Sequence, residues 1–273
     1  AGVVTGSTGA AGYLIGPQQN DAFVVVNRLL KAGERVSRLP GTGAIYIAAT
    51  PAAGAIVDRA ARELGLTFAG VAAPPYVVSG FSRTENAAAL RPVRVGLVDR
   101  HGGWSTSGWI RWILERYEFP FEVVHPPALD AGNLLSRYDV LILPSDAVPT
   151  SRTDMGGVTV TGTIPALKAF VEGGGTLVAI GGATSAARYL GVPVSRPLAH
   201  LPDGEFFVPG SVLRVAVDTT TPLGYGFGRD VDVVFDKSPV FRLEPEATAR
   251  GVRAVAWFDT PAPLRSGWAW GQS

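Results

Sequence analysis

Polar and aromatic side chains gather directly after an apolar run at residues 93–98. Those that could bind a ligand are Asp99, His101, Trp104, Ser107 and Trp109. Sheets built of parallel strands bind ligands beyond the carboxyl ends of those strands, and residue 99 follows such an end. We therefore expect a site for a polar ligand with a stacking face, such as a sugar or a peptide terminus. The alternative is that the tryptophans pack in a core and the serine only caps a helix.

A second position where chemistry could occur is the turn at Gly181 and Gly182, which follows the apolar run 176–180. A buried, central strand that turns sharply into a helix presents its next residue to solvent, beside backbone N–H groups. A nucleophile would stand at residue 181, but glycine has no side chain. We therefore expect no catalytic residue at this turn, and we include both glycines in the candidate ligand site.

The sequence lacks the residue patterns that other catalytic and metal-binding sites require. The chain has no cysteine, and its three histidines, His101, His125 and His200, are far apart in sequence, with no HExxH pattern. A zinc site needs ligands that converge, and two of them are usually close in sequence, so we expect no metal in this chain. The GxSxG pattern of serine hydrolases is also absent, although a Ser/His/Asp set assembled from distant residues stays possible.

The glycines at the N-terminus do not indicate a cofactor. Gly6, Gly9 and Gly12 could let the backbone approach a pyrophosphate, but a dinucleotide-binding loop must lead straight into a long helix. Here Gly16 and Pro17 interrupt the chain before a helix begins. We expect a loop or flexible leader at these residues, and no cofactor in this chain.

Composition favours a globular chain without a nucleic-acid or membrane partner. Of 273 residues, 47% are hydrophobic and 17% charged, and 24 basic residues balance 23 acidic ones. No apolar run reaches the ~20 residues of a membrane helix, and residues 1–12 lack the order of a signal peptide. Scattered basic residues give no electrostatic footprint for nucleic acid.

The elements that position these residues form two series. In the first, a helix capped by Asn20 should end at Gly33 and place its apolar residues on one buried face, namely Phe23, Val26, Leu29 and Leu30. Strands are expected at 35–39, 44–48 and 67–72, and a helix at 51–64. Residues 73–92 resemble a linker, so we divide the chain into an α/β unit at 1–90 and a larger domain at 91–273.

The second series alternates strand and helix. Strands are expected at 93–98, 121–124, 138–143 and 176–180, and helices at 107–117 and 164–172. This order predicts a doubly wound, mainly parallel α/β sheet of the flavodoxin-like or amidotransferase-like kind. The long polar loop 145–162 could close over its ligand face as a lid. A β-rich tail follows from residue 205, with strands at 212–218, 231–235 and 252–258.

Three segments of this series resemble a known superfamily. Residues 94–98 (RVGLV), 138–144 (YDVLILP) and 170–180 (FVEGGGTLVAI) are similar to the core of class I glutamine amidotransferase-like domains, the superfamily that includes the DJ-1 proteins. Those enzymes keep a cysteine at the position of Gly181. The resemblance implies an amidotransferase-like fold without its nucleophile.

A more specific resemblance extends over residues 12–270. Residues 20–33, 107–121 and 205–211 are similar to the long C-terminal region of bacterial zinc carboxypeptidase-type (carboxypeptidase A-like) metallopeptidases. In such proteins the zinc and its ligands lie in a separate N-terminal peptidase domain. The resemblance implies a non-catalytic accessory domain for substrate engagement or domain packing, whose partner is that peptidase domain and whose parent would be secreted or periplasmic.

Two other functions stay open at this point. The chain could be an autonomous hydrolase whose serine or aspartate site is not evident from the sequence. It could also be a binding module for a sugar or another small molecule.

Overall fold

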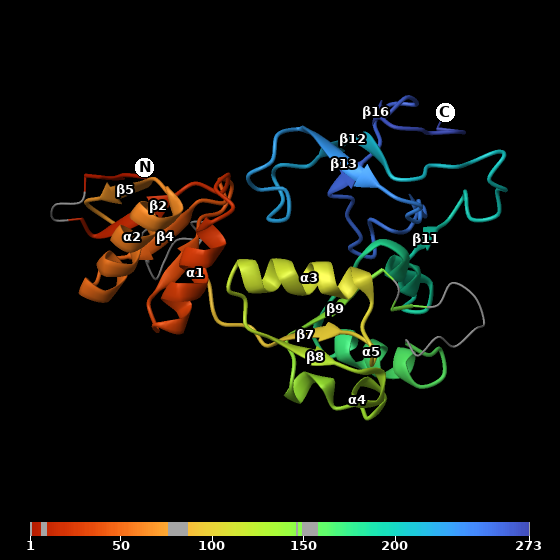
Figure 1. Cartoon of the computed structure of the whole chain (residues 1–273), viewed down its shortest axis with the longest axis horizontal. Helices are drawn as coiled ribbons and strands as arrows, with labels where there is room; N and C mark the ends of the chain where they lie inside the picture. The colour runs from red at the N-terminus through yellow and green to blue at the C-terminus, as the bar shows by residue number, and fades with distance from the viewer. Residues whose placement is uncertain (1, 7–9, 76–86, 146, 149–157, 273) are drawn as a thin grey trace. The chain divides into compact units, whose positions relative to one another are not determined.

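The computed structural model describes residues 2–6, 10–75, 87–145, 147–148 and 158–272 (Figure 1). The chain forms two compact units, and each combines segments that are distant in sequence. The first unit contains residues 1–92, 117–119 and 216–231. The second contains residues 93–116, 120–215 and 232–273. The domain boundary that we predicted between residues 90 and 91 stays a prediction.

The first unit contains a mixed six-stranded sheet in the order β1-β5-β2-β4-β3-β6. Strands β1 and β5 are parallel, and β2, β3, β4 and β6 pair with their neighbours in antiparallel fashion. The strands are β1 (Val4–Thr5), β2 (Gly12–Ile15), β3 (Val36–Arg38), β4 (Ile45–Ala48), β5 (Phe68–Val71) and β6 (Ala88–Ala89).

Helices α1 (Ala22–Lys31) and α2 (Pro51–Leu64) pack on this sheet. Helix α2 has strong local signals at both ends, because the Thr50 hydroxyl accepts a hydrogen bond from the Ala53 N–H and Gly65 adopts a left-handed conformation. These signals explain why the sequence predicted both ends of α2. Its buried alanines and Val57 join Val25, Leu29 and Phe68 in the core of the first unit.

Three expectations for this unit were wrong. Gly12, expected in a loop or flexible leader, is in strand β2; it is buried, and a Cβ there would lie 2.4 Å from the Tyr46 ring. Phe23 is not on the buried face of α1; it is 42% exposed and contacts the rings of Tyr117 and Phe119. Residues 88–89, assigned to a linker, pair with β3.

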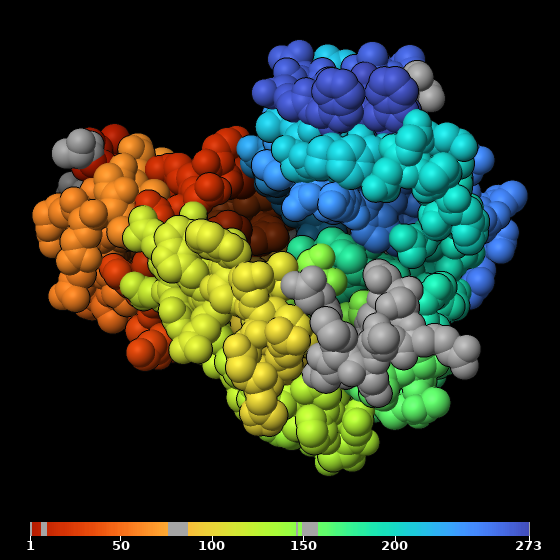
Figure 2. All heavy atoms as spheres, turned by 45° about the vertical axis from the view of Figure 1, so that its right-hand side comes forward, coloured from red at the N-terminus to blue at the C-terminus, as the bar shows by residue number. Residues whose placement is uncertain are grey.

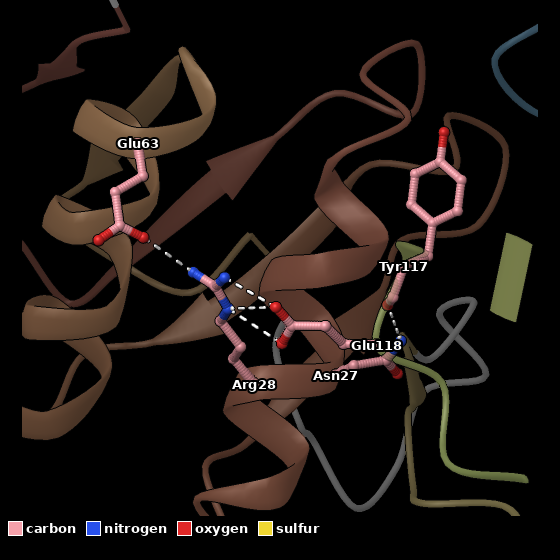
Figure 3. Close-up of polar contacts among 5 residues, drawn as sticks. All are labelled: Asn27, Arg28, Glu63, Tyr117 and Glu118. Atoms are coloured by element: carbon pink, nitrogen blue, oxygen red, sulfur yellow. Dashed lines mark hydrogen bonds and ion pairs between the residues drawn. The ribbon is translucent and has the colours of Figure 1, made fainter. Parts of the chain in front are cut away.

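Residues 117–119 are held on α1 by a polar clamp (Figure 3). The Arg28 guanidinium donates to both carboxylate oxygens of Glu118, at 2.7–3.1 Å, and also reaches Glu63. The Asn27 amide donates to the Tyr117 carbonyl at 2.8 Å. The hydrogen bond from Arg28 lowers the pKa of Glu118. The clamp thus fixes a segment that is 90 residues away in sequence.

The second unit contains a four-stranded, fully parallel sheet in the order β10-β9-β7-β8. Figure 1 shows α3 on one side of this sheet and α4 and α5 on the other, as a doubly wound fold requires. The expected α/β class and parallel sheet are therefore confirmed. The elements are β7 (Val95–Val98), α3 (Ser105–Arg116), β8 (Phe121–Val124), α4 (Pro126–Asp130), η1 (Leu134–Ser136), β9 (Val140–Leu143), α5 (Thr163–Glu172), β10 (Thr176–Ala179) and η2 (Gly181–Arg188).

The core of this sheet lies around β7 and β9. Val98, Leu141 and Leu143 are fully buried, with Leu167 and Phe170 of α5 packed on them. Strand β10 is different, because it lies at the edge of the sheet and its Val178 is 39% exposed. The expectation of a buried, central strand at 176–180 was wrong, since an apolar run does not distinguish a central strand from an edge strand.

The remainder of the second unit is rich in short strands, as expected. Strands β12, β13, β15 and β16 form one sheet, β11 and β14 another, and Val208, Leu213 and Phe235 form a small core. The strand predicted at 252–258 was wrong except at residues 256–257, and helix α4 was not predicted. The bounds are β11 (Val194–Ser195), β12 (Ser211–Val217), β13 (Asp230–Phe235), β14 (Arg242–Leu243), β15 (Ala256–Trp257) and β16 (Leu264–Ser266).

In the described part of the chain, every helix is too short or too polar to cross a bilayer.

Candidate functional site

The candidate site lies at the carboxyl edge of the parallel sheet. After β7 the chain crosses to β8 on one side, and after β8 it returns to β9 on the other side of β7. The order of strands therefore reverses between β7 and β9, which is where sheets of this kind bind ligands. The last paired rungs join Val98 with Val124 and Leu143 with Ala179, so the residues that follow these four share one edge.

Asp99 organises the loop after β7. Its carboxylate accepts hydrogen bonds from the backbone N–H of Arg100 at 2.8 Å and of Trp104 at 3.1 Å. Gly102 and Gly103 have φ of +90° and +75°, which a loop this tight requires. The Arg100 side chain donates back to the Gly103 carbonyl at 3.1 Å. Asp99 therefore uses one carboxylate oxygen to shape the loop.

Trp104 and Ser107 form the start of α3. The Ser107 hydroxyl donates to the Trp104 carbonyl at 2.8 Å, and this side chain is 1% exposed. The Trp104 ring packs against the core, with the Arg100 guanidinium 5.6 Å from its centroid. Trp109 lies one turn further along α3, is 69% exposed and meets Trp112 edge to face. The structure thus joins Asp99, Trp104 and Ser107 in one hydrogen-bonded loop, whereas Trp109 projects from the helix.

Two histidines stack beside this loop. The rings of His101 and His125 are 4.0 Å apart and inclined by 24°. The His125 Nδ1 lies 3.1 Å from the Asp99 carbonyl oxygen. Residues 101 and 125 are in different loops, and their stacking depends on the parallel pairing of β7 with β8. No local pattern in the sequence indicates that His125 belongs beside His101.

Gly181 and Gly182 meet Ser145, which follows β9. The Gly182 N–H donates to the Ser145 Oγ at 2.9 Å, and Gly181 has φ of +54°. A Cβ at residue 181 would lie 2.7 Å from the same Ser145 Oγ, which is less than any real Cβ contact. The space where a nucleophile would begin is therefore filled by a hydroxyl from the neighbouring strand.

Ser145 lies at this edge, and the sequence did not predict it as a site residue. It entered only as the first residue of the proposed lid 145–162, most of which lies outside the described residues. The available signal was Pro144, which ends β9 and places residue 145 at the carboxyl edge, next to the turn after β10. The described residues contain no group of three or more His, Asp or Glu side chains placed to hold a metal ion.

Chemically, the described residues at this edge offer hydrogen-bonding groups. It carries the Ser145 hydroxyl, two imidazoles and a loop held by Asp99. Whether the seven predicted residues bind a ligand stays a prediction.

Comparisons with known proteins found little. No family model and no curated protein matches the chain. Among solved structures, the chain is similar to a crystal structure assigned as a GMP synthase component from Thermoplasma acidophilum. The sequences are 13% identical, the match covers 57% of this chain and 71% of that one, and the TM-score is 0.38.

Proposed function

We propose that this chain is a non-catalytic, amidotransferase-like module that engages a polar ligand at the carboxyl edge of its parallel sheet. One observation carries the proposal: the Ser145 hydroxyl stands 2.7 Å from where a side chain at residue 181 would begin. A cysteine at that turn would have to displace Ser145 and break its hydrogen bond with Gly182. The turn is therefore adapted to binding or packing, and not to nucleophilic attack.

A more specific part of the proposal concerns the larger protein to which the module belongs. We propose that it accompanies a zinc carboxypeptidase-type peptidase domain, which would hold the zinc and perform the hydrolysis. The resemblance of residues 20–33, 107–121 and 205–211 supports this context. In that arrangement the ligand at the sheet edge would be part of a peptide or a glycopeptide.

The proposal is tested with the purified 273-residue chain. We expect no turnover of glutamine, p-nitrophenyl acetate or short peptides above buffer, with or without added zinc. Titration with short peptides and glycans should change tryptophan fluorescence saturably, and Trp104→Phe should reduce that change more than Trp109→Phe. Turnover that is lost in Ser145→Ala would overturn the proposal in favour of a serine hydrolase.

A second candidate function is sugar binding elsewhere on the second unit. Trp268 and Trp270 are 59% and 52% exposed, and their rings are parallel within 5° at a distance of 6.3 Å. Figure 2 shows this C-terminal segment, in dark blue, at the surface. Exposed parallel indoles offer apolar faces to sugar rings, which have both apolar and polar sides. Loss of glycan binding in Trp268→Ala, with binding kept in Trp104→Phe, would favour this candidate.

A further inference from the structure

The first unit contains a cavity that the proposed function does not use. Its volume is about 410 Å³, within the range of about 300–1,000 Å³ typical of small-molecule sites. The described residues on its wall are mostly apolar, with Phe23, Ile45, Leu90 and Phe227 among them. Every lining segment belongs to the first unit, and the segment 222–227 forms one wall.

The cavity adjoins the core of the first unit, because Ala22 and Val26 of α1 and Ile45 of β4 belong to that core and also line the cavity. Val36 and Arg38 alternate with Ser37 along β3, so they lie on the same face of the sheet, and they pair with Ile47 and Ile45 of β4. Val36, Ile45 and Ile47 belong to the core. Arg38 therefore occupies a position on the core face of the sheet, where an apolar residue would be usual.

Arg38 is the charged residue among the described residues that line the cavity. Its Nε is buried and has no hydrogen-bond partner among the described residues. An unpaired donor that is shielded from water is destabilising, and more so when it belongs to a charged group. A carboxylate is the natural partner of a guanidinium, because its two oxygens match the two parallel N–H donors.

The wall formed by residues 222–227 is fixed in place. The Gly41 N–H donates to the Tyr225 hydroxyl at 3.0 Å, and a Cβ at Gly43 would lie 2.6 Å from the Tyr225 ring. A Cβ at Gly226 would lie 2.6 Å from the Pro17 carbonyl oxygen. Gly43 and Gly226 both have positive φ, and these close approaches leave no space for a side chain at either position, so the wall depends on both glycines.

From this geometry we infer that the cavity binds a small carboxylate with an apolar body, whose head group pairs with Arg38 and whose body contacts Phe23, Ile45 and Phe227. The binding site is independent of the function proposed for the second unit. The shared chemistry is one carboxylate on an aromatic or aliphatic body, and the two kinds of body are separate arms of the test.

Isothermal titration of the full chain would test this site with 3-phenylpropionate and octanoate, each beside its neutral alcohol, 3-phenylpropan-1-ol or octan-1-ol. We expect saturable binding of at least one acid, and about tenfold weaker binding of the matching alcohol. Arg38→Met should reduce acid binding by about tenfold and leave alcohol binding unchanged. Arg62→Met, which removes an exposed arginine on α2 outside the cavity, should change neither.

A second variant keeps the test decisive if Arg38→Met does not fold. Phe227 is 57% exposed, so Phe227→Ala should leave the fold intact, which circular dichroism checks, and should weaken acid and alcohol alike. The inference is overturned if an acid and its alcohol bind equally, or if neither acid binds at millimolar concentration. Binding that persists in both Arg38→Met and Phe227→Ala would also overturn it, because the ligand would then lie elsewhere.

Discussion

At the turn after β10, two residues that are distant in sequence share one small volume. Gly181 has φ of +54°, and Ser145 supplies the hydroxyl that accepts the Gly182 N–H. The absence of a nucleophile at residue 181 could be predicted from the sequence, because it depends on one residue type. The approach of Ser145 could not, because it depends on the register between β9 and β10.

Substitution at Gly181 should reveal two constraints, the left-handed backbone and the close approach of Ser145. Gly181→Ala is expected to lower the free energy of unfolding by roughly 1–2 kcal/mol for the left-handed backbone alone. A further loss should come from Ser145, which must rotate away and leave the Gly182 N–H without its acceptor, at about 1 kcal/mol. Urea denaturation measures the sum.

A double-mutant cycle separates the two contributions. In the Ser145→Gly background the hydroxyl is already absent, so Gly181→Ala should cost about 1 kcal/mol less than it does in the unsubstituted chain. Equal costs in the two backgrounds would mean that Ser145 does not fill the space at residue 181.

The residues around Asp99 also show that contacts between segments distant in sequence could not be predicted. Asp99, Trp104 and Ser107 were expected at one strand end, and they share hydrogen bonds because they are close in sequence. His125 was not expected there, because it is brought to His101 only by the pairing of two strands. Local patterns therefore predict clusters within a loop, but not clusters across loops.

At the scale of elements, burial in the sheet depends on strand order rather than on apolar content. Strands β9 and β10 are both apolar, yet Leu141 of β9 is fully buried and Val178 of β10 is 39% exposed. Leu141→Ala should therefore lower the free energy of unfolding by about 2–5 kcal/mol. Val178→Ala should lower it by about 0.5 kcal/mol or less, as is usual for surface positions. Similar costs in urea denaturation would contradict the edge position of β10.

Sequence patterns predicted elements with strong end signals and missed weakly marked ones. Helix α2 has a threonine cap, a proline in its first turn and a glycine after its end, and its predicted bounds agree with the structure. Helix α4 has only five residues and no side-chain cap. The strand expected at 252–258 failed because an apolar stretch forms a strand only where a neighbour is available to pair with it.

The clamp between residues 117–119 and α1 should make stability depend on pH. The hydrogen bond from Arg28 lowers the pKa of Glu118 in the folded chain. A carboxyl group with a lowered folded pKa stabilises the fold above its unfolded pKa of about 4.3, and this stabilisation is lost as the pH falls through the folded value. Glu118→Gln should therefore cost up to about 1 kcal/mol at neutral pH, because the pair is partly exposed, and nothing well below pH 4.

Glu115→Gln is the matched control for the loss of one negative charge. Glu115 pairs with Arg111 one turn away on α3, and both side chains are more than half exposed. Its cost at neutral pH should be about 0.3–0.5 kcal/mol. Thermal unfolding of both variants between pH 3 and pH 7 makes the comparison; a Glu118→Gln cost that does not change with pH would show that its charge is irrelevant to the clamp.

At the scale of the whole molecule, the two units are not the two halves of the chain. Residues 216–231 belong to the first unit, although 123 residues separate them from residue 92. No composition shift near residue 216 marks this return, so the sequence alone did not indicate it. The return shapes the site that we propose, because residues 222, 223 and 225–227 line the Arg38 cavity.

This arrangement makes residues 1–92 incomplete by themselves. In the full chain the Gly41 N–H donates to the Tyr225 hydroxyl, and the Tyr225 ring covers Gly43. An isolated 1–92 fragment lacks that partner, and it also lacks Glu118 for Arg28. We therefore expect it to melt at a lower temperature than the first unit of the full chain, with fast hydrogen exchange at Gly41.

Tyr225→Phe separates the hydrogen bond from the packing of the ring. In the full chain it should speed exchange at Gly41 while the melting temperature falls little, because one such hydrogen bond contributes about 1 kcal/mol. A 1–92 fragment as stable as the intact unit, with Gly41 equally protected, would show that the returning segment adds a wall to the cavity without contributing to the fold.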